Sequence, residues 1–392
     1  MFIMGIGFMS KPLQYIEQSQ MAKKGGDKMT PVPSFDPLGL PAPVIVNLAL
    51  KVFGFWVHWF FMGMWFSGLL VALFLIKIKN PDLSLVGMRI FKTMPIFIAF
   101  GINAGIVPLL FIQVLFPNFF YTSTILQAWF WFFIVALVLI SYYGIYFFIF
   151  NHEKPERKIF AYGAGWLSSL IFLFVGLIFS SEMKLMVSPE SWSAYASFGP
   201  GGTVNGTSLA LSIQAVLRYF MVFGLSTVSL SAYLLFDNYF LQKENQIRDN
   251  IKKLFLFLLI GGILIFGLAG HKYLGYIAPY LKDFVLWKYL PGVAPLLTLL
   301  VGILYYKKPS RILALLTFFG ALLSLLVNSI SRQIVQIEEL EPFLKLKDLP
   351  LRVQFSPILL FLITLIFGLF VLGYLLKVYF VETRRMDGLQ NS

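Results

Sequence analysis

The sequence contains no cysteine, only three histidines and few charged residues. The absence of cysteine excludes a thiolate-ligated iron–sulfur cluster, a covalently attached c-type haem and any disulfide bond. Charged residues make up 12% of the 392 residues, whereas hydrophobic residues make up 58%. The mean hydropathy is +0.81, a value that an ordinary soluble domain of this length does not reach. The chain is therefore expected to be a polytopic membrane protein.

Nine apolar stretches are long enough to cross a lipid bilayer as helices, which takes about 20 residues each. They cover residues 46–76, 94–116, 124–150, 160–180, 209–236, 253–271, 289–306, 311–331 and 356–380. The expected fold is all-α, with two four-helix membrane bundles and one further C-terminal helix. Small residues such as Gly63, Gly224 and Gly262 allow the close helix contacts that such bundles need.

The connections between the spans divide the chain into six parts. The predicted parts are an extended arm on the outer side at 1–44, the first bundle at 45–180, an outer loop at 181–208, the second bundle at 209–331, an outer loop at 332–355, and a final helix with an inner tail at 356–392. Several prolines precede the first span, where a helix should not yet begin. Because long loops often carry function, the two outer loops are candidate docking surfaces.

Basic residues indicate the orientation of the chain in the membrane. Every odd-numbered span is followed by a segment rich in Lys and Arg, as at 77–92 and 307–311, whereas the segment after the second span has no charge. The positive-inside rule then places the N-terminus outside and the C-terminus in the cytoplasm, in the cell inner (cytoplasmic) membrane. The net charge of +13 is attributed to this topology and to contact with anionic lipid, not to nucleic acid.

Four side chains in the predicted spans are the candidates for chemistry. His58 lies within an apolar run, where an ionisable group is costly in lipid and needs a partner, a metal or a cofactor. It stands about 12 residues into the first span, or about 18 Å along a helix, which places it in the outer half of the membrane. Arg218 and Met221 in the fifth span, and His271 at the end of the sixth, fall in the same half.

These residue types suit a haem b, which takes His most often and Met next as axial ligands and has cationic groups near its propionates. His58 is the candidate ligand of the haem iron, Met221 and His271 are further candidates, and Arg218 is the candidate cation. Each also has a simpler interpretation. His58 could hydrogen-bond a neighbouring helix, Met221 could be an apolar core residue, and His271 could lie at the membrane surface.

Several short segments carry a family resemblance. They are His58 in the first span and residues 100–106, 186–192, 217–221 and 332–335. From about residue 40 onward, the chain resembles the large, haem-bearing subunit of the cytochrome bd quinol oxidases, and in particular the bd-like membrane subunits that accompany other cytochromes. The resemblance implies nine spans with an outer N-terminus, and it implies that His58 occupies the position of a haem ligand.

The chain also departs from the pattern of that family. It has no Glu or Asp from Thr93 to Tyr121, where the oxidases place a carboxylate, and Met221 stands where they have a histidine in the fifth span. The long quinol-binding loop with its Gly-Arg-Gln-Pro-Trp signature is not found. Because dioxygen reduction consumes protons that must pass through protonatable groups, this chain by itself is not expected to reduce oxygen.

The function expected from the sequence is that of a membrane subunit in a respiratory electron-transfer complex. It would pass electrons between membrane quinone and a c-type cytochrome partner on the outer side, with haem b and quinone as cofactors and other membrane subunits as partners. Two alternatives stay open. One is a cofactor-free anchor that docks redox subunits. The other is a secondary transporter, which the scarcity of paired ionisable residues in the spans disfavours.

Overall fold

The chain folds almost entirely into long helices. The computed structural model describes residues 39–196, 209–353 and 355–390, so the predicted arm at 1–38 and the loop at 197–208 lie outside the described residues. The long helices are α2 (Val44–Phe66), α3 (Gly68–Lys77), α4 (Pro81–Leu115), α5 (Pro117–Phe132), α6 (Ile134–Asn151), α7 (Lys158–Met186), α9 (Ile213–Phe236), α10 (Asp249–Ile277), α11 (Val285–Lys307), α12 (Arg311–Leu340) and α13 (Phe355–Gln390). Short helical turns are η1 (Pro189–Ser191), α8 (Trp192–Tyr195), η3 (Asp237–Leu241), η4 (Ala278–Leu281) and η5 (Leu346–Asp348). The predicted all-α fold class is confirmed.

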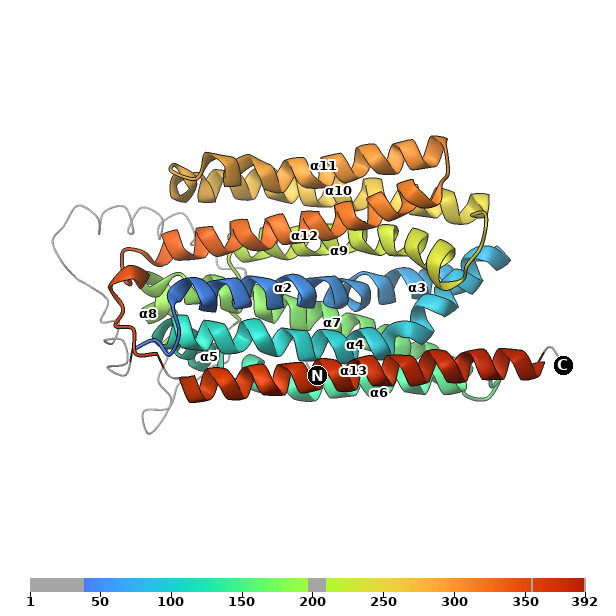
Figure 1. Ribbon diagram of the computed structural model, residues 1–392, viewed down its shortest axis with the longest axis horizontal. Coiled ribbons are helices and arrows are strands. Elements are labelled where there is room, and N and C mark those ends of the chain that lie inside the picture. The colour runs from blue at the N-terminus through green and yellow to red at the C-terminus, as the bar shows by residue number, and fades with distance from the viewer. Residues whose placement is uncertain (1–38, 197–208, 354, 391–392) are drawn as a thin grey trace, which may run out of the picture.

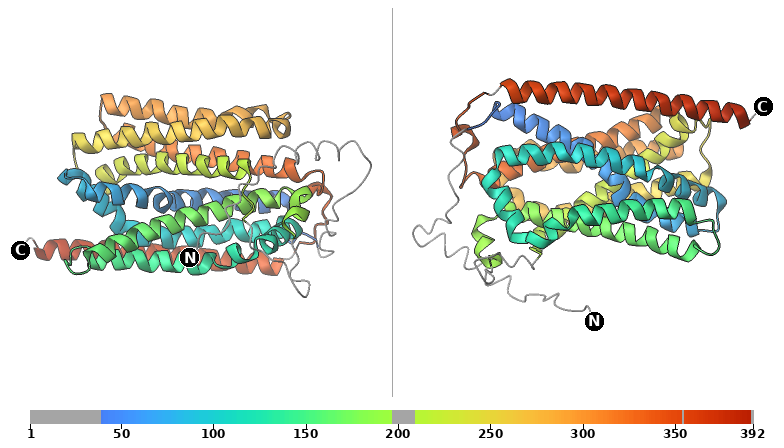
Figure 2. Two further views of the ribbon diagram at one scale, coloured as in Figure 1. Left: turned by 180° about the vertical axis from the view of Figure 1, so that it is seen from behind. Right: turned by 90° about the horizontal axis from the view of Figure 1, so that it is seen from below.

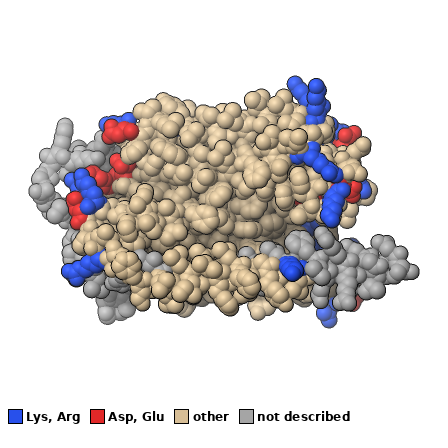
Figure 3. Space-filling view, in the orientation of Figure 1, with Lys and Arg blue, Asp and Glu red and all other residues tan. Residues whose placement is uncertain are grey.

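The long helices run nearly parallel to one another, as expected of a bundle that crosses a bilayer (Figure 1). Eight helical segments of the described chain are long and apolar enough to span a membrane, with α2 and α3 forming one such segment and α5 and α6 another. The described part of α13 adds a shorter apolar stretch, Leu359–Val371. On the face in Figure 3, charged side chains gather at the two ends and leave a broad apolar band between them. The chain is a multi-pass membrane protein.

The helices form two four-helix bundles that share an interface. In the first bundle, α2 packs against α4 and α7, and α6 packs against both of these. In the second bundle, α9, α10, α11 and α12 close a ring in which each packs against the next. Helix α2 joins the bundles through contacts with α9 and α12 (Figures 1 and 2). Helix α13 lies at the periphery, where Phe361 contacts the ring of Phe111 edge-on.

The two ends of the molecule differ in their connections. One end, on the left in Figure 1, carries the described residues 187–196, 209–212 and 341–353, and we call it the long-loop end. There, Leu40 pairs with the second loop: its N–H donates to the carbonyl of Pro350 at 2.7 Å, and its own carbonyl accepts from the N–H of Arg352 at 2.9 Å. The chain is therefore fastened to that loop just before α2 begins.

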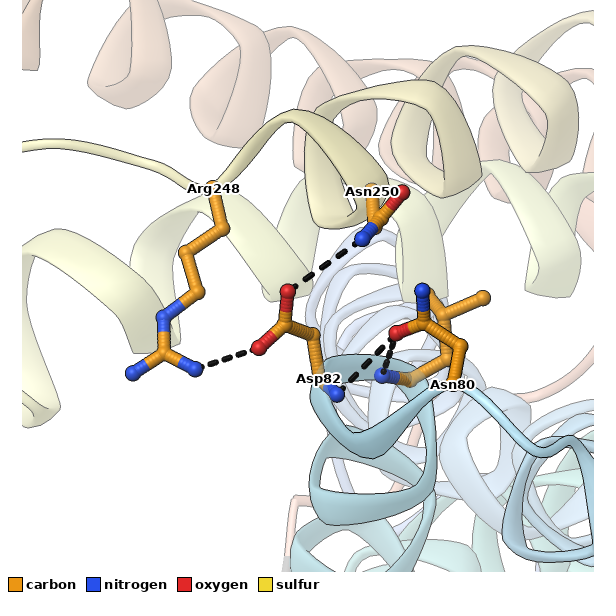
Figure 4. Close-up of polar contacts among 5 residues, drawn as sticks. Asn80, Asp82, Arg248 and Asn250 are labelled. Atoms are coloured by element: carbon orange, nitrogen blue, oxygen red, sulfur yellow. Dashed lines mark hydrogen bonds and ion pairs between the residues drawn. The ribbon is translucent and has the colours of Figure 1, made fainter.

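The other end, the short-loop end, is held by charged side chains. Asp82 in the first turn of α4 pairs with Arg248 and also accepts a hydrogen bond from Asn250 at 3.2 Å (Figure 4). The N-cap Asn80 accepts from the N–H groups of Asp82 and Leu83, which otherwise have no partner in the first turn. These contacts tie the first bundle to the start of α10.

Helix boundaries differ from the sequence prediction at the long-loop end. The outer loops were expected to begin at residues 181 and 332, but α7 continues to Met186 and α12 to Leu340. Two of the charges in these extensions, Lys184 and Glu339, pair with each other at 3.1 Å and join the extended ends of α7 and α12. The turn expected at 117–123 is helical as well, because Pro117 is tolerated in the first turn of α5, where its missing N–H has no role.

Helices α9 and α10 approach each other through two facing glycines. A Cβ atom built on Gly224 would lie 2.7 Å from the carbonyl oxygen of Gly262 and 2.6 Å from the backbone nitrogen of Phe266. Because these are backbone atoms, the two helices would have to move apart to admit a methyl group. The glycines therefore set the distance between the two helices.

We expect Gly224→Ala to lower the free energy of unfolding by about 1–3 kcal/mol, the usual cost of overpacking. Gly261→Ala is the matched control, because a Cβ at Gly261 meets no atom within 4 Å. The control should be neutral or slightly stabilising, since alanine is the better helix former. Thermal unfolding in one detergent measures both variants. Equal midpoints for the two would contradict the close contact.

Candidate functional site

The imidazole of His58 is held in one orientation by the neighbouring helix. Its Nδ1 lies 2.7 Å from the carbonyl oxygen of Gly101 on α4. Because a carbonyl oxygen only accepts hydrogen bonds, Nδ1 carries the hydrogen, and in the neutral ring Nε2 then has a free lone pair. Within the described part of the chain, Nε2 has no hydrogen-bond partner, and the side chain is half-buried. Histidines that bind metals have the same arrangement. One ring nitrogen donates to a carbonyl, which fixes the ring, and the other nitrogen is free to bind the metal.

Two glycines of α4 make room for this arrangement. A Cβ atom on Gly105 would lie 2.7 Å from His58 Nδ1, and a Cβ on Gly101 would lie 2.1 Å from the ring of Trp65. The Trp65 ring in turn meets the imidazole edge-on, with 6.3 Å between ring centres. Both glycines belong to the segment 100–106 that the sequence analysis singled out. The structure therefore brings that segment and His58 together.

One side of α2 carries two more residues of this region besides His58. Lys51, Phe55 and His58 are spaced at i, i+4 and i+7 and so share that side of the helix. The guanidinium of Arg332 on α12 lies over the Phe55 ring, 4.2 Å from its centre. Lys51 is 4% exposed and donates to Gln336, one turn beyond Arg332, which fixes the register between α2 and α12.

Lys51, Arg218 and Arg332 form what we call the basic cluster. Arg332 is close enough to repel the charges of Lys51 and Arg218, and both arginines interact with the hydroxyl of Tyr273. Among the described residues, none of the three cations is paired with a carboxylate. Lys51 is buried and the two arginines are partly buried, and an unpaired charge is costly in such a place. The cluster is therefore suited to binding the anionic groups of a ligand.

The charge of Arg332 acts on both Arg218 and His58. Within the described part of the chain, no direct interaction between Arg218 and His58 is found. Met221 packs among apolar side chains of α2, α9 and α10, in clusters that include Trp59 and Tyr273. The cluster that joins Met221 to α2 contains Trp59 and Phe55, whereas the imidazole of His58 is directed to α4. No contact among the described residues joins Met221 to His58.

His271 is also separate from the other candidates. Its side chain is exposed, whereas Tyr273, two positions later, is buried against the basic cluster. Two residues in an α-helix differ by about 200° around the axis, so His271 faces away from Arg218. Of the two predicted histidines, His58 is the one whose ring is oriented by a hydrogen bond to a neighbouring helix within the described residues.

Sequence reasoning missed Arg332 and Lys51 as members of this region. Arg332 was assigned to an outer loop, and Lys51 was not singled out within the first span. The signal that could have found them is their spacing. Arg332, Gln336 and Glu339 are spaced at i, i+4 and i+7 on one side of a helix, and Lys51, Phe55 and His58 have the same spacing.

The donor set limits the chemistry of the region. Within the described residues, no group of three or more His, Asp or Glu side chains could hold a metal ion by itself. One oriented imidazole, a glycine-lined helix face and unpaired cations do fit a haem, which needs a single axial histidine and has two carboxylates.

No protein-family model matches this chain, and no curated protein matches it either.

Proposed function

We propose that this chain is a membrane subunit of a respiratory electron-transfer complex, similar to the bd-like subunits, and that it binds one haem b through His58. The observation that carries this proposal is the hydrogen bond from His58 Nδ1 to the Gly101 carbonyl, which leaves Nε2 free for iron.

The residues around His58 have separate roles in this proposal. His58 would hold the haem iron, with its ring oriented by Gly101 and Gly105. Arg218 and Arg332 would pair with the propionates, and Lys51, which donates to Gln336, would hold the neighbouring part of α12 in place. When bound, a haem b supplies one-electron transfer. A quinone, the second proposed cofactor, would find hydrogen-bond donors in the same basic cluster.

The proposed setting is the cell inner membrane, with the long-loop end outside. The segments at the short-loop end carry most of the Lys and Arg residues that follow odd-numbered spans, which supports placing this end in the cytoplasm. His58 then lies nearer the outer surface, on the side where a c-type cytochrome partner would accept or donate electrons. The long loops at that end are the proposed docking surface for it and for other subunits.

A second candidate function, a cofactor-free scaffold for redox subunits, is favoured by one specific observation. Met221 packs in an apolar cluster and His271 is exposed, so neither accompanies His58 as a second ligand among the described residues. A haem would then be held by His58 and the basic cluster, or with a further ligand from another subunit.

A reduced-minus-oxidised spectrum and a pyridine haemochrome on the purified subunit separate the two candidates. The proposal predicts b-type haem at about one per chain. If a subunit purified under conditions that retain cofactors contains no haem, the scaffold function is the candidate that remains.

A further inference from the structure

Glu182, in the last turn of α7, is a carboxyl group that the proposed electron transfer does not use. Its side chain is 0% exposed. Its one hydrogen-bond partner in the described part is the hydroxyl of Ser123 on α5, which also lies 2.8 Å from the carbonyl of Phe119, and Glu182 belongs to no ion pair there. Helix α5 carries no charged residue, and Lys184, two positions along α7, is paired with Glu339. An ionised carboxylate in this place would lack a counter-charge, which is costly in a membrane interior.

The hydrogen bonds of the neighbouring side chains show which acceptor atom has no donor. Gln127, one turn after Ser123 on α5, donates from Nε2 to the hydroxyl of Ser181 at 3.2 Å. Ser181 donates its own hydrogen to the carbonyl of Ala210 at 2.6 Å. Because Ser181 has a single hydrogen, it cannot also donate to Gln127. The amide orientation of Gln127 is thereby fixed, and Oε1 is its other, free end.

Two buried acceptors then have no donor: Oε2 of Glu182 and Oε1 of Gln127. They belong to adjacent pairs across the α5–α7 interface, since Ser123 contacts Glu182 and Gln127 contacts Ser181. One hydrogen on Glu182 Oε2, donated to Gln127 Oε1, would satisfy both atoms. A metal cation would need several more oxygen ligands than these two.

We propose that Glu182, Gln127 and Ser123 form a proton-binding site in which Glu182 is a neutral carboxylic acid that donates to Gln127. Ser181, which accepts from Gln127, donates to the carbonyl of Ala210 at the long-loop end, and the proton of the site exchanges with solvent at that end of the molecule. The site gives the chain one exchangeable proton inside the membrane-spanning region. It goes beyond the proposed electron transfer and holds whether or not haem binds.

Infrared spectroscopy of the full-length protein in detergent tests the protonation state. The wild type should show a carboxylic acid C=O band above the amide I band, and Glu182→Gln should lose it. Glu190→Gln is the matched control, because Glu190 is exposed at the same end of the molecule and should leave the band unchanged. The absence of an acid band in the wild type, together with a thermal midpoint that rises with sodium or potassium, would show a cation-bound carboxylate and overturn the proposal.

Two further measurements test the hydrogen bonds and the exchange. Ser123→Ala keeps the acid but removes the hydroxyl that hydrogen-bonds its Oε1, so the band should move to higher frequency. This variant also carries the test if Glu182→Gln does not fold. In D₂O, the wild-type band should shift to lower frequency while the protein stays folded. A band that does not shift in folded protein would mean a sealed structural acid and would refute the exchange with solvent.

Discussion

His58→Ala is expected to remove haem b from the purified subunit. Loss of a hydrogen-bond partner of a metal-binding histidine typically costs about 10- to 100-fold in affinity, and loss of the ligand itself should cost more than that. The haem content per chain should therefore fall below detection by pyridine haemochrome, while the helical content stays as in the wild type. The half-buried ring leaves little packing to lose, so the variant should fold.

The other two histidines provide matched controls. His152 stacks on Phe148 at the short-loop end, and His271 is exposed on α10. Alanine at either position should leave the haem content unchanged. If His271→Ala and His58→Ala each lost haem, both histidines would be ligands. That result would contradict the exposed position of His271 on α10.

Gly105→Ala offers an independent test of the same geometry without touching the ligand. The added methyl group would meet His58 Nδ1 at 2.7 Å, so the ring must turn away from Gly101. We expect a haem affinity about 10- to 100-fold lower, comparable to losing the carbonyl partner. Gly163→Ala is the control, because a Cβ there meets no atom within 4 Å. Unchanged haem binding in Gly105→Ala would show that the glycine does not position His58.

Glu339→Leu is expected to cause the largest loss of stability. Glu339 and Lys184 form an ion pair between α12 and α7 at 3.1 Å, with side chains 5% and 16% exposed. Removing one partner of a buried pair costs about 3–5 kcal/mol because the other charge stays buried without compensation. We expect the lower end of this range, since Lys184 keeps some access to solvent.

Glu341→Leu is the matched control for that substitution. Glu341 pairs with Lys345 at 3.9 Å, but both side chains are more than half exposed. An exposed pair of this kind contributes about 0.3–0.5 kcal/mol. Unfolding of both variants in the same detergent should therefore differ clearly. Similar losses in the two variants would mean that the Lys184–Glu339 pair is not buried in the folded protein.

The fold followed from the sequence to a large extent because apolar length determines which segments can cross a bilayer. The nine predicted stretches correspond to the long helices, and short basic connections place consecutive helices side by side. The helix ends at the long-loop end could not be predicted in the same way. Charged residues such as Arg332 and Glu339 normally mark the exit from a membrane, but here Glu339 is buried and Arg332 is partly buried at contacts between α12 and its neighbours.

The candidate site was predicted only in part. His58 could be singled out because a histidine is rare in an apolar span, and the segment containing Gly101 and Gly105 was singled out by resemblance. The positions of Met221 and His271 depend on how α9 and α10 are rotated about their axes, which a count of residues along the chain does not give. Glu182 was missed because it lies just past the expected end of its span, where a carboxyl group reads as part of a loop.

Imidazole rescue of His58→Gly tests the central claim most directly. The glycine variant leaves a space the size of the lost ring beside Gly101 and Gly105, and free imidazole can enter it. If His58 ligates haem iron, the variant should lack the b-type spectrum, and added imidazole should restore it on reconstitution with haem. A folded variant that keeps its haem without imidazole, or a wild type without haem, would contradict the assignment.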